Sequence, residues 1–254
     1  MVDIHSHILP GWDDGSRSLD ESLSMLRIAA EAGTTDIVAT PHANSEFPYD
    51  PGLIQGKFEE LRAAAGDLIR IHLACDFHLS YENVQDAIEH PDKYTINNKS
   101  YLMVELPDMI APESARSVMS RLHQSGMTCV ITHPERNPRL SVKLDVLKQC
   151  VQEGALVQIT GQSLLGRFGS AAKASAHQIF KQGLVHFIAS DAHDCEDRPP
   201  RLDLARKYVE ERFGAPLAER LFDINPRATL SGAYIDDHVP EDSGPRRKWY
   251  SFWS

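Results

Sequence analysis

The chain has 254 residues, a formal net charge of −10, 42% hydrophobic and 24% charged residues, and a mean hydropathy of −0.34. This composition is typical of a globular protein with one large core, and it excludes a disordered, collagen-like or coiled-coil chain. The acidic balance argues against nucleic acid as a partner, and no apolar run approaches the roughly 20 residues that a bilayer span requires.

The first half of the chain predicts strands and helices in alternation. The strands expected here lie at 2–5, 36–40, 69–75 and 101–105. The helices expected between them lie at 19–32, 51–65 and 81–88. Ser18 and Glu21 have the spacing of a capping box, and Asp50 followed by Pro51 is typical of a helix start.

The second half continues this alternation. Its expected strands lie at 128–132, 156–160 and 185–190. Its expected helices lie at 112–124, 144–153, 171–182, 201–213 and 216–221, with a final turn at Asn225-Pro226. Seven apolar strands that alternate with helices predict an α/β fold with parallel strands, either a (β/α) barrel or a doubly wound sheet. The chain has neither a G-x-G-x-x-G after its first strand nor a P-loop, which argues against a nucleotide-binding fold.

Residues that bind metals follow almost every predicted strand. In a barrel, the carboxyl ends of the strands build the active site at one end of the fold, so these side chains are expected to meet. Strand 156–160 is the exception, because it offers only Gln158 and Thr160. The candidate ligands are His5, His7, Asp14, His42, Asp76, Glu105, His133, Asp191 and His193.

The chemistry of this set predicts a cluster of divalent cations. His5 and His7 are two residues apart on a strand and are therefore expected on the same side. Five imidazoles with four carboxylates favour manganese, iron, zinc or cobalt over calcium. Nine ligands are too many for one ion, so two or three ions that share a bridging carboxylate are expected. Such a cluster lowers the pKa of bound water to about 7 and supplies hydroxide.

Two arginines near these ligands favour a phosphorylated substrate. Arg136 lies three residues after His133, and Arg198 lies in the loop after Asp191. The planar guanidinium group matches the oxygens of phosphate. The alternative is that each arginine forms an ordinary surface ion pair, with Glu135 or Asp197 as its partner.

The four cysteines, Cys75, Cys129, Cys150 and Cys195, have no disulfide-like or metal-binding spacing. The N-terminus has no export signal, so we expect reduced thiols in a cytoplasmic protein. Cysteine-dependent phosphatases need a thiolate and an arginine in one tight phosphate loop. Cys129 and Arg136 are separated by His-Pro without a glycine, so that chemistry is disfavoured.

Four segments together resemble the polymerase-and-histidinol-phosphatase (PHP) superfamily. They are Asp3-Ile-His5-Ser-His7-Ile-Leu-Pro-Gly-Trp-Asp13-Asp14-Gly, Thr40-Pro-His42, His133-Pro-Glu-Arg136-Asn and Phe187-Ile-Ala-Ser-Asp191-Ala-His193. Within it, the chain is most similar to the CpsB/CapC-type protein-tyrosine phosphatases of bacterial capsule and exopolysaccharide operons. The resemblance covers about residues 1–235, taken as one PHP metallophosphatase domain, and includes the segment Gln162-Ser-Leu-Leu-Gly-Arg-Phe-Gly169.

The resemblance implies a distorted seven-stranded (β/α) barrel with three metal ions, usually manganese. One ion would be held by His5, His7, Glu105 and Asp191, a second by Asp76, Glu105 and His133, and a third by Asp14, His42 and His193. Arg136 and Arg198 would bind the substrate phosphate. Asp76 stands where the family usually has a glutamate, which is one methylene longer, so the second site departs most from the pattern.

The resemblance also implies a substrate and a mechanism. The usual substrate is the tyrosine-phosphorylated tail of a membrane-anchored autokinase that controls polysaccharide export. A metal-bridging hydroxide would attack phosphorus while the arginines neutralise the phosphate oxygens. A tyrosine phenolate, whose conjugate acid has a pKa of about 10, leaves with little help, and a metal ion, His42 or His193 could supply it.

Three alternatives use much of the same residue set. A small-molecule PHP phosphatase would hydrolyse a phosphomonoester such as histidinol phosphate. A metal-dependent amide hydrolase shares the H-x-H motif but usually adds a carbamylated lysine, for which Lys143 and Lys148 are misplaced. A metal-dependent adaptor would bind phosphopeptide without releasing phosphate.

The C-terminal tail, residues 236–254, differs in composition from the rest of the chain. An acidic segment precedes Arg246-Arg-Lys-Trp-Tyr-Ser-Phe-Trp253. We expect either a flexible terminus or a basic and aromatic segment that contacts a membrane surface or the partner kinase. The oligomeric state is not predicted from the sequence.

Overall fold

In the computed structural model, which describes residues 1–235, the seven predicted strands form, and two short strands follow the second and the third of them. The second forms as β2 (Asp36–Ala39), and β3 (His42–Ala43) follows after Pro41, which has no N–H to donate to a neighbouring strand. The third forms as β4 (Arg70–Leu73), and β5 (Asp76–His78) follows it. Both additional strands begin at a candidate metal ligand.

The remaining strands form close to their predicted positions. They are β1 (Val2–Ser6), β6 (Tyr101–Glu105), β7 (Thr128–Thr132), β8 (Leu156–Thr160) and β9 (Phe187–Ala189). All the pairings are parallel, in a three-stranded sheet β1-β2-β4 and a six-stranded sheet β3-β5-β6-β7-β8-β9. The loop after β9 binds β1 through Asp191 N to His5 O (2.9 Å) and His7 N to Ala192 O (2.8 Å). The strand order therefore runs around a distorted (β/α) barrel, and the predicted α/β fold with parallel strands is confirmed.

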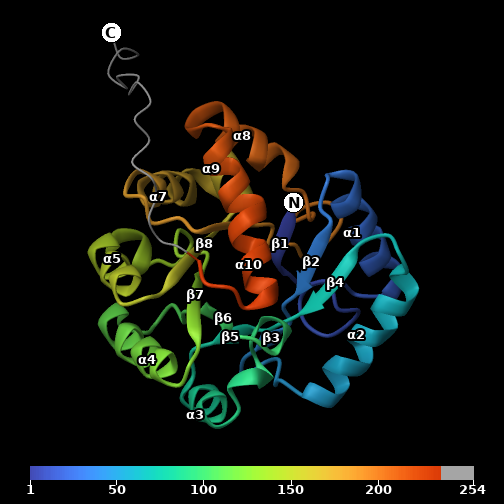
Figure 1. The fold of residues 1–254 in the computed structure, drawn as a ribbon, viewed down its shortest axis with the longest axis horizontal. Helices are drawn as coiled ribbons and strands as arrows, with labels where there is room; N and C mark the ends of the chain where they lie inside the picture. Colours follow the sequence, from blue (N-terminus) through green and yellow to red (C-terminus); the bar gives the residue numbers. More distant parts are fainter. Residues whose placement is uncertain (236–254) are drawn as a thin grey trace.

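Helices surround this barrel (Figure 1). They are α1 (Leu19–Glu31), α2 (Pro51–Ala65), α3 (Tyr81–Glu89), α4 (Pro112–Gln124), α5 (Leu144–Gln152), α6 (Gly161–Leu165), α7 (Gly169–Lys181), α8 (Asp203–Phe213), α9 (Ala215–Glu219) and α10 (Asn225–Ser231). Short 3-10 turns lie at Pro91–Lys93, Ile96–Asn98 and Leu140–Val142. Helix α6 is not predicted from the sequence. The expected final turn is a helix, reached from α9 through a π-helical segment at Arg220–Ile224.

The predicted helix starts are largely correct. Asp50 accepts hydrogen bonds from the amides of the first turn of α2, and Ser18 accepts one from Glu21 N at 3.2 Å. The capping box is only half formed, because the Glu21 carboxylate binds the backbone N–H and guanidinium group of Arg17. Within the described residues, no helix is both long and apolar enough to cross a membrane.

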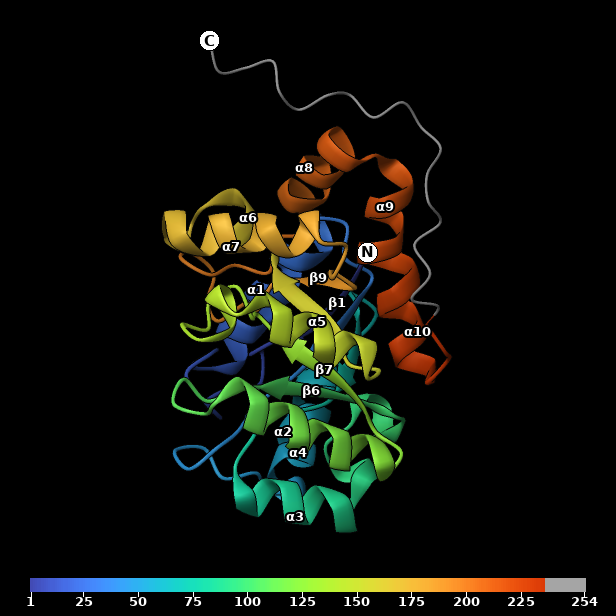
Figure 2. The ribbon, with the colours of Figure 1, turned by 90° about the vertical axis from the view of Figure 1, so that its left-hand side faces the viewer.

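Apolar side chains fill the inside of the barrel, and α10 covers one end of it. Ile4, Val38, Met103 and Phe187 belong to one buried cluster, against which Ala228 and Leu230 of α10 pack. Figure 2 shows α10 on the side opposite to the end toward which the β7 arrow points. The end at which the strands finish is therefore not covered by α10.

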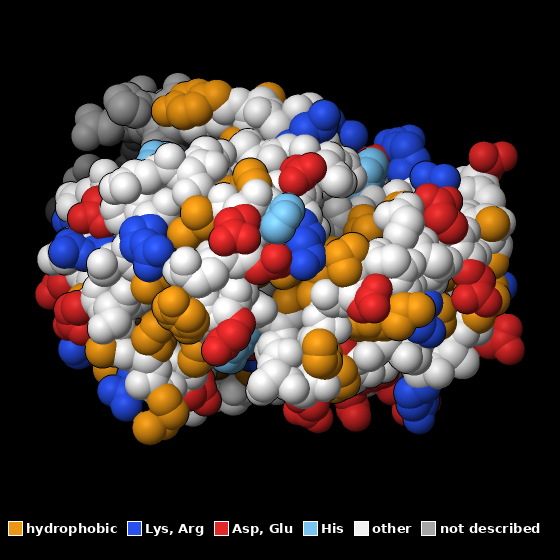
Figure 3. Space-filling model, turned by 90° about the horizontal axis from the view of Figure 1, so that it is seen from below, with side chains coloured by type: hydrophobic (Ala, Val, Ile, Leu, Met, Phe, Trp, Pro, Cys, Tyr) orange, Lys and Arg blue, Asp and Glu red, His pale blue; other side chains and the backbone are white. Residues whose placement is uncertain are grey.

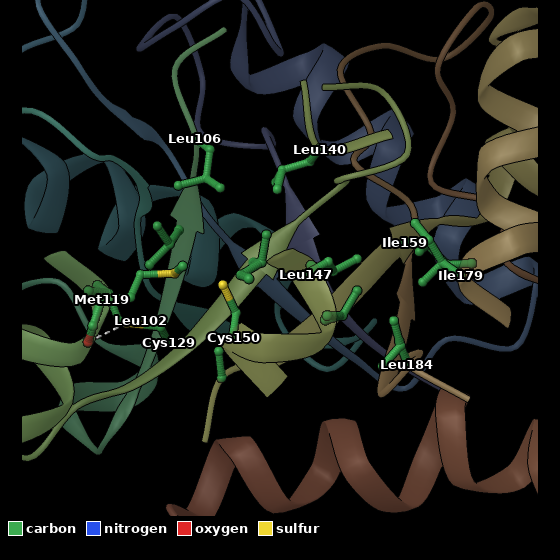
Figure 4. Close-up of a cluster of buried hydrophobic side chains, with 14 of the residues drawn as sticks. Leu102, Leu106, Met119, Cys129, Leu140, Leu147, Cys150, Ile159, Ile179 and Leu184 are labelled. Atoms are coloured by element: carbon green, nitrogen blue, oxygen red, sulfur yellow. Dashed lines mark hydrogen bonds between the residues drawn. The ribbon is translucent and has the colours of Figure 1, made fainter. Parts of the chain in front are cut away.

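A second and larger cluster fills the space between the barrel and its outer helices. Cys129 and Cys150 both lie in it, and the Cys129 thiol approaches Met119 O at 4.0 Å (Figure 4). Burial raises the pKa of the Cys129 thiol to about 12. A buried protonated thiol in an apolar cluster does not act as a nucleophile, in agreement with the sequence analysis.

The outer surface on the side of α3 carries acidic and basic side chains interspersed with hydrophobic ones (Figure 3). This face has no continuous basic area of the kind that a nucleic-acid backbone requires. The predicted segment 236–254 lies outside the described residues.

A candidate metal and phosphate site

The nine predicted ligands meet at the end of the barrel where the strands finish. Four groups of ligand atoms, each within 4.8 Å of one another, link them. The groups are His7, Asp14, His42 and His193; His5, His7 and Asp76; His5, His133 and Asp191; and His42, Asp76 and Glu105. The residues that the sequence analysis selected therefore converge in space, as expected from parallel strands in a barrel.

An irregularity in β1 places its first imidazole in this site. The pairing of β1 with β2 shifts register between Asp3 and Ser6. Ile4 belongs to the interior cluster, and the next residue, His5, also faces inward and lies against Gln158. The Nε2 atoms of His5 and His7 are 3.3 Å apart, so both imidazoles lie on the same side, as predicted.

His5 is held by a residue of the strand that offers no metal ligand. Its Nδ1 lies 2.9 Å from Gln158 Oε1, an oxygen that can only accept, so Nδ1 carries the proton. The other ring nitrogen, Nε2, then faces the site, 3.5 Å from Asp191 Oδ1 and 3.7 Å from Asp76 Oδ2. A hydrogen bond on the outer nitrogen is the usual arrangement for a metal-binding histidine.

His7 is held in the same way by Asp13. Asp13 Oδ2 lies 2.8 Å from His7 Nδ1, and it also accepts a hydrogen bond from His42 N at 3.1 Å. Asp13 Oδ1 accepts from Gly15 N at 3.1 Å, which fixes the loop. A Cβ on Gly15 would lie only 2.1 Å from His7 O, so only glycine allows the loop to approach His7 this closely.

A second part of the site lies around Asp14, which is the most exposed ligand, with 54% of its side chain accessible. Its Oδ1 lies 3.3 Å from His42 Nε2 and 3.5 Å from His193 Nε2. His193 Nδ1 donates to the carbonyl oxygen of Asp191 at 3.0 Å, which again directs Nε2 to the site. Asp14, His42 and His193, the three residues expected to hold the third ion, therefore lie together.

Asp76 and Glu105 lie at the centre, between the two parts. Asp76 Oδ2 and Glu105 Oε2 are 3.3 and 3.7 Å from His42 Nδ1, and Glu105 Oε1 is 3.8 Å from His133 Nε2. Asp76 therefore reaches the cluster despite its short side chain. His78 was not predicted, and its Nδ1 lies 3.6 Å from Glu105 Oε2.

Two ligands have an unusual backbone. His133 has φ 32° and Asp191 has φ 52°, in the left-handed region that non-glycine residues rarely adopt. Such conformations are energetically costly and concentrate at functional sites. His133 follows β7 directly, and Asp191 lies two residues after the end of β9.

The pKa values of the buried ligands are shifted by loss of contact with water and by the charges of neighbouring ligands. Burial lowers the pKa of His5, but Asp76 and Asp191 outweigh this and raise it to about 9. Burial and the neighbouring His193 lower the pKa of His7 to about 4. Although burial raises the pKa of Asp76, the imidazoles around it hold that pKa well below its usual range.

The donor set fits divalent cations. Both Asp76 oxygens, His42 Nδ1 and His78 Nδ1 are buried without a hydrogen-bond partner among the described residues. Unpaired buried polar atoms are costly unless a ligand compensates them. Imidazole nitrogens and carboxylate oxygens that face one another at 3.3 to 3.8 Å are an arrangement that a cation bound between them would stabilise.

The two predicted phosphate-binding arginines share one carboxylate. Arg198 donates from Nη2 to Asp191 Oδ2 at 2.6 Å, and Arg136 donates to the same oxygen. The alternative partners, Glu135 and Asp197, are not the ones used. Glu135 is buried and accepts from Thr160 N and Ser163 Oγ, and the carbonyl oxygen of Asp197 faces Arg167. Both arginines keep about a quarter of their side chains exposed, at 27% and 23%.

Sequence reasoning missed three residues that act on this site through their neighbours: Asp13, Gln158 and Phe168. Asp13 had a signal, since it precedes Asp14 in the same loop. Gln158 had a weaker one, because it lies on the inward face of a strand without a ligand. Phe168, whose ring contacts both arginines, lies in the segment 162–169 that carries part of the resemblance, but nothing in the sequence indicates that it meets the arginines.

A comparison with known families decides the relationship. Residues 1–231 of the chain match the family described as "Capsular polysaccharide synthesis, CpsB/CapC". The chain belongs to the CpsB/CapC family. The recognition made from the four sequence segments is therefore confirmed.

Individual members of the CpsB/CapC family agree with this result. Tyrosine-protein phosphatase YwqE of Bacillus subtilis is 31% identical over 256 residues, with 100% of each chain covered. Tyrosine-protein phosphatase CpsB of Streptococcus agalactiae is 30% identical over 246 residues, which are 92% of this chain and 100% of CpsB. The prediction of a tyrosine phosphatase is thus confirmed at the level of the family.

A solved structure shows the same architecture. Crystal structures of YwqE from Bacillus subtilis and CpsB from Streptococcus pneumoniae, described as metal-dependent tyrosine phosphatases, match with a TM-score of 0.85 and 32% identity. The match covers 93% of this chain and 96% of the other. The α/β fold expected for this CpsB/CapC family member is confirmed.

Proposed function

We propose that this protein is a metal-dependent protein-tyrosine phosphatase that acts on a tyrosine-phosphorylated autokinase of polysaccharide export. The observation that carries the proposal is the convergence, at one end of the barrel, of nine metal-binding side chains and two arginines bound to one of them, Asp191. The membership of the CpsB/CapC family supports the link to capsular polysaccharide synthesis. The protein acts in the cytoplasm, and any contact with the membrane is made through its partner or through residues 236–254.

The predicted ligands would hold the metal ions. His5, His7, Glu105 and Asp191 would hold one ion, Asp76, Glu105 and His133 a second, and Asp14, His42 and His193 a third. Glu105 reaches both His42 and His133, which suits a bridging ligand. When bound, two or three divalent cations supply an activated water and neutralise the anionic oxygens of the substrate. We propose manganese as the bound metal, and iron, zinc and cobalt suit the same donors.

The protein side chains bind and orient the phosphate. Arg136 and Arg198 present guanidinium N–H groups at the same place, and both are accessible from solvent. They bind the non-bridging oxygens and neutralise charge as it develops. His42 and His193 lie beside the exposed Asp14, and either can hold a proton for the leaving phenolate where no cation occupies its Nε2.

The test is phosphate release from a phosphotyrosine peptide by the full-length protein, combined with elemental analysis. We expect two or three metal ions per chain, loss of activity after chelation and recovery when manganese is added. Matched assays use histidinol phosphate and a phosphoserine peptide of the same sequence. Faster turnover of histidinol phosphate would favour a small-molecule phosphatase, and phosphopeptide binding without phosphate release would favour an adaptor.

The partner is tested separately. The autokinase encoded in the same polysaccharide operon, purified in its tyrosine-phosphorylated form, should be dephosphorylated faster than an unrelated phosphotyrosine protein. Equal rates would contradict the assignment of the autokinase and leave the phosphatase chemistry in place.

A further inference from the structure

Strand β8 contributes a different kind of residue to the site. It ends without a metal ligand, and the chain then forms the short helix α6, turns at Gly166 and reaches Phe168 before α7 begins. Gly166 has φ 86°, a conformation that glycine adopts without strain, and the turn it makes returns the chain toward the site. Phe168 is only partly buried.

The ring of Phe168 lies against both phosphate-binding arginines. The Arg136 Cζ atom is 4.4 Å from the centre of the ring, and the Arg198 Cζ atom is 5.6 Å from it. These arginines come from the loops after β7 and β9, the two strands that flank β8 in the sheet. One aromatic side chain from the middle strand therefore contacts both guanidinium groups from its neighbours.

The segment that carries Phe168 is fixed to the same two loops. Glu135, the residue before Arg136, accepts hydrogen bonds from Thr160 N (2.9 Å) and Ser163 Oγ (2.7 Å) at the start of α6. On the other side, Arg167 donates to the carbonyl oxygen of Asp197, the residue before Arg198, at 3.4 Å. The three segments are thus held together by contacts of residues adjacent to the arginines and to Phe168.

We propose that Phe168 is a positioning residue that orients Arg136 and Arg198 toward a single phosphate group. This inference rests on the proposed role of the two arginines. An arginine side chain has many rotamers, and binding phosphate requires that their number be reduced. Asp191 fixes one N–H of each guanidinium, while the face of the ring fixes the plane in which the remaining N–H groups point. Cation–π attraction and apolar contact both favour this position.

The alternative is that Phe168 only fills space. Filling space requires an apolar side chain of similar size, whereas orienting two guanidinium groups requires a flat aromatic face. Phe168→Leu keeps an apolar side chain and removes the ring, and Phe168→Tyr keeps the ring. The pair of variants therefore separates the two roles.

The experiment measures the dissociation constant of inorganic phosphate by calorimetry, on the metal-loaded full-length protein. We expect Phe168→Leu to weaken phosphate binding by about 3- to 30-fold, the range of a cation–π contact, and Phe168→Tyr to change it by less than about twofold. The metal content and melting temperature of both variants should match those of the wild type. The KM for a small aryl phosphate should rise in parallel, with a smaller change in kcat.

A double-mutant cycle tests the coupling to the arginines. Arg136→Lys keeps the charge and loses the planar group. Phe168→Leu should therefore weaken phosphate binding less in the Arg136→Lys protein than it does in the wild type. Equal effects in both backgrounds, or unchanged phosphate binding in a folded Phe168→Leu protein, would overturn the inference. If Phe168→Leu does not fold, Phe168→Met takes its place in the same cycle.

The outcome is distinguishable from failure of the proposed function. A wild-type protein that hydrolyses no phosphotyrosine, yet binds phosphate more tightly than Phe168→Leu does, would contradict the phosphatase proposal and support the role of Phe168. A wild-type protein that is an active phosphatase, with Phe168→Leu indistinguishable from it, would do the opposite.

Discussion

The two ends of the barrel both contain a buried aspartate, and they treat it differently. At the end covered by α10, Asp36 accepts two hydrogen bonds from Arg70 (both 2.7 Å) and one from Thr35 Oγ1 (2.8 Å), with Arg227 at 3.3 Å. At the other end, both oxygens of Asp76 are buried without a hydrogen-bond partner among the described residues. The protein thus supplies hydrogen-bond donors to the Asp36 carboxylate. It supplies none to the Asp76 carboxylate among the described residues, so this carboxylate is free to bind a ligand.

This difference separates a structural charge from a functional one. The pKa of each carboxyl group is lowered by its neighbours, so the direction of the shift does not distinguish them. What distinguishes them is the hydrogen bonding, because a buried carboxylate without donors is stable only with a cation beside it. The same change should therefore affect different properties at the two ends: activity and metal binding at Asp76, and stability at Asp36.

The largest expected effect is on activity. Asp76→Asn should lower aryl phosphate hydrolysis by on the order of a thousandfold, because metal binding and water activation depend on that carboxylate. The metal content should fall, and added manganese should raise the melting temperature less than it does in the wild type. Asp36→Asn is the matched control and should keep wild-type kcat. An Asp76→Asn protein with more than a tenth of wild-type activity would contradict the comparison.

The next effect is on metal affinity. Asp13→Asn weakens the partner of His7 Nδ1, so manganese should bind about 10- to 100-fold more weakly, as is usual for residues that orient a ligand. The dissociation constant is measured by calorimetry on the metal-free protein. Asp20→Asn, on the exposed surface of α1, is the control. Equal affinity in both variants would mean that His7 needs no orienting carboxylate.

A smaller effect is on stability. Asp36→Asn should lower the free energy of unfolding by about 1–3 kcal/mol, because it removes hydrogen bonds between a buried carboxylate and charged donors. Urea unfolding of the metal-free protein measures the loss, and Asp67→Asn on the exposed surface is the control.

The stability difference should also depend on pH in one direction. The folded state holds the pKa of Asp36 below the ordinary value of 3.8, chiefly through Arg70 and Thr35, which outweigh burial. The contribution of the carboxylate is therefore complete above pH 3.8 and is lost as the pH falls further. Wild type and Asp36→Asn should converge in acid, and a difference that grows there would contradict the role of the charge.

The smallest effect is expected for Cys129→Ser. The side chain lies in the cluster outside the barrel, so kcat should stay within about twofold of the wild type, while the free energy of unfolding falls by about 1 kcal/mol. Phosphate release and urea unfolding measure the two quantities. Loss of activity in a folded Cys129→Ser protein would refute metal-dependent hydrolysis and favour a thiol nucleophile.

The sequence allowed the set of candidate ligands to be predicted because barrel topology decides which ends of the strands meet. His5, Glu105 and His133 are far apart in the chain, and their parallel strands bring them to the same end. The short strands β3 and β5, which begin at His42 and Asp76, were not predicted, because two or three residues are too few to show a strand pattern in the sequence. The contacts of Gln158 and Phe168 were not predictable either, since they depend on the direction of individual side chains.

The ion-pair partners show the same limit. Glu135 and Asp197 are neighbours of the arginines in sequence, yet Arg136 and Arg198 both bind Asp191. Adjacent residues on a strand or turn point to different sides, so nearness in the chain is a poor guide to pairing. Glu135 points to α6 instead, where it fixes the segment that carries Phe168.

The register shift in β1 makes this strand sensitive to changes in length as well as in residue type. Ile4 belongs to the apolar interior of the barrel, and His5 belongs to the cluster of candidate metal ligands. Two adjacent residues of β1 therefore serve both the core and the site. The residues between Asp3 and Ser6 are Ile4 and His5, so deleting either one would restore the regular alternation of the strand and leave a single inward-facing side chain there. Such a frame-preserving deletion should abolish metal loading in a protein whose composition has barely changed.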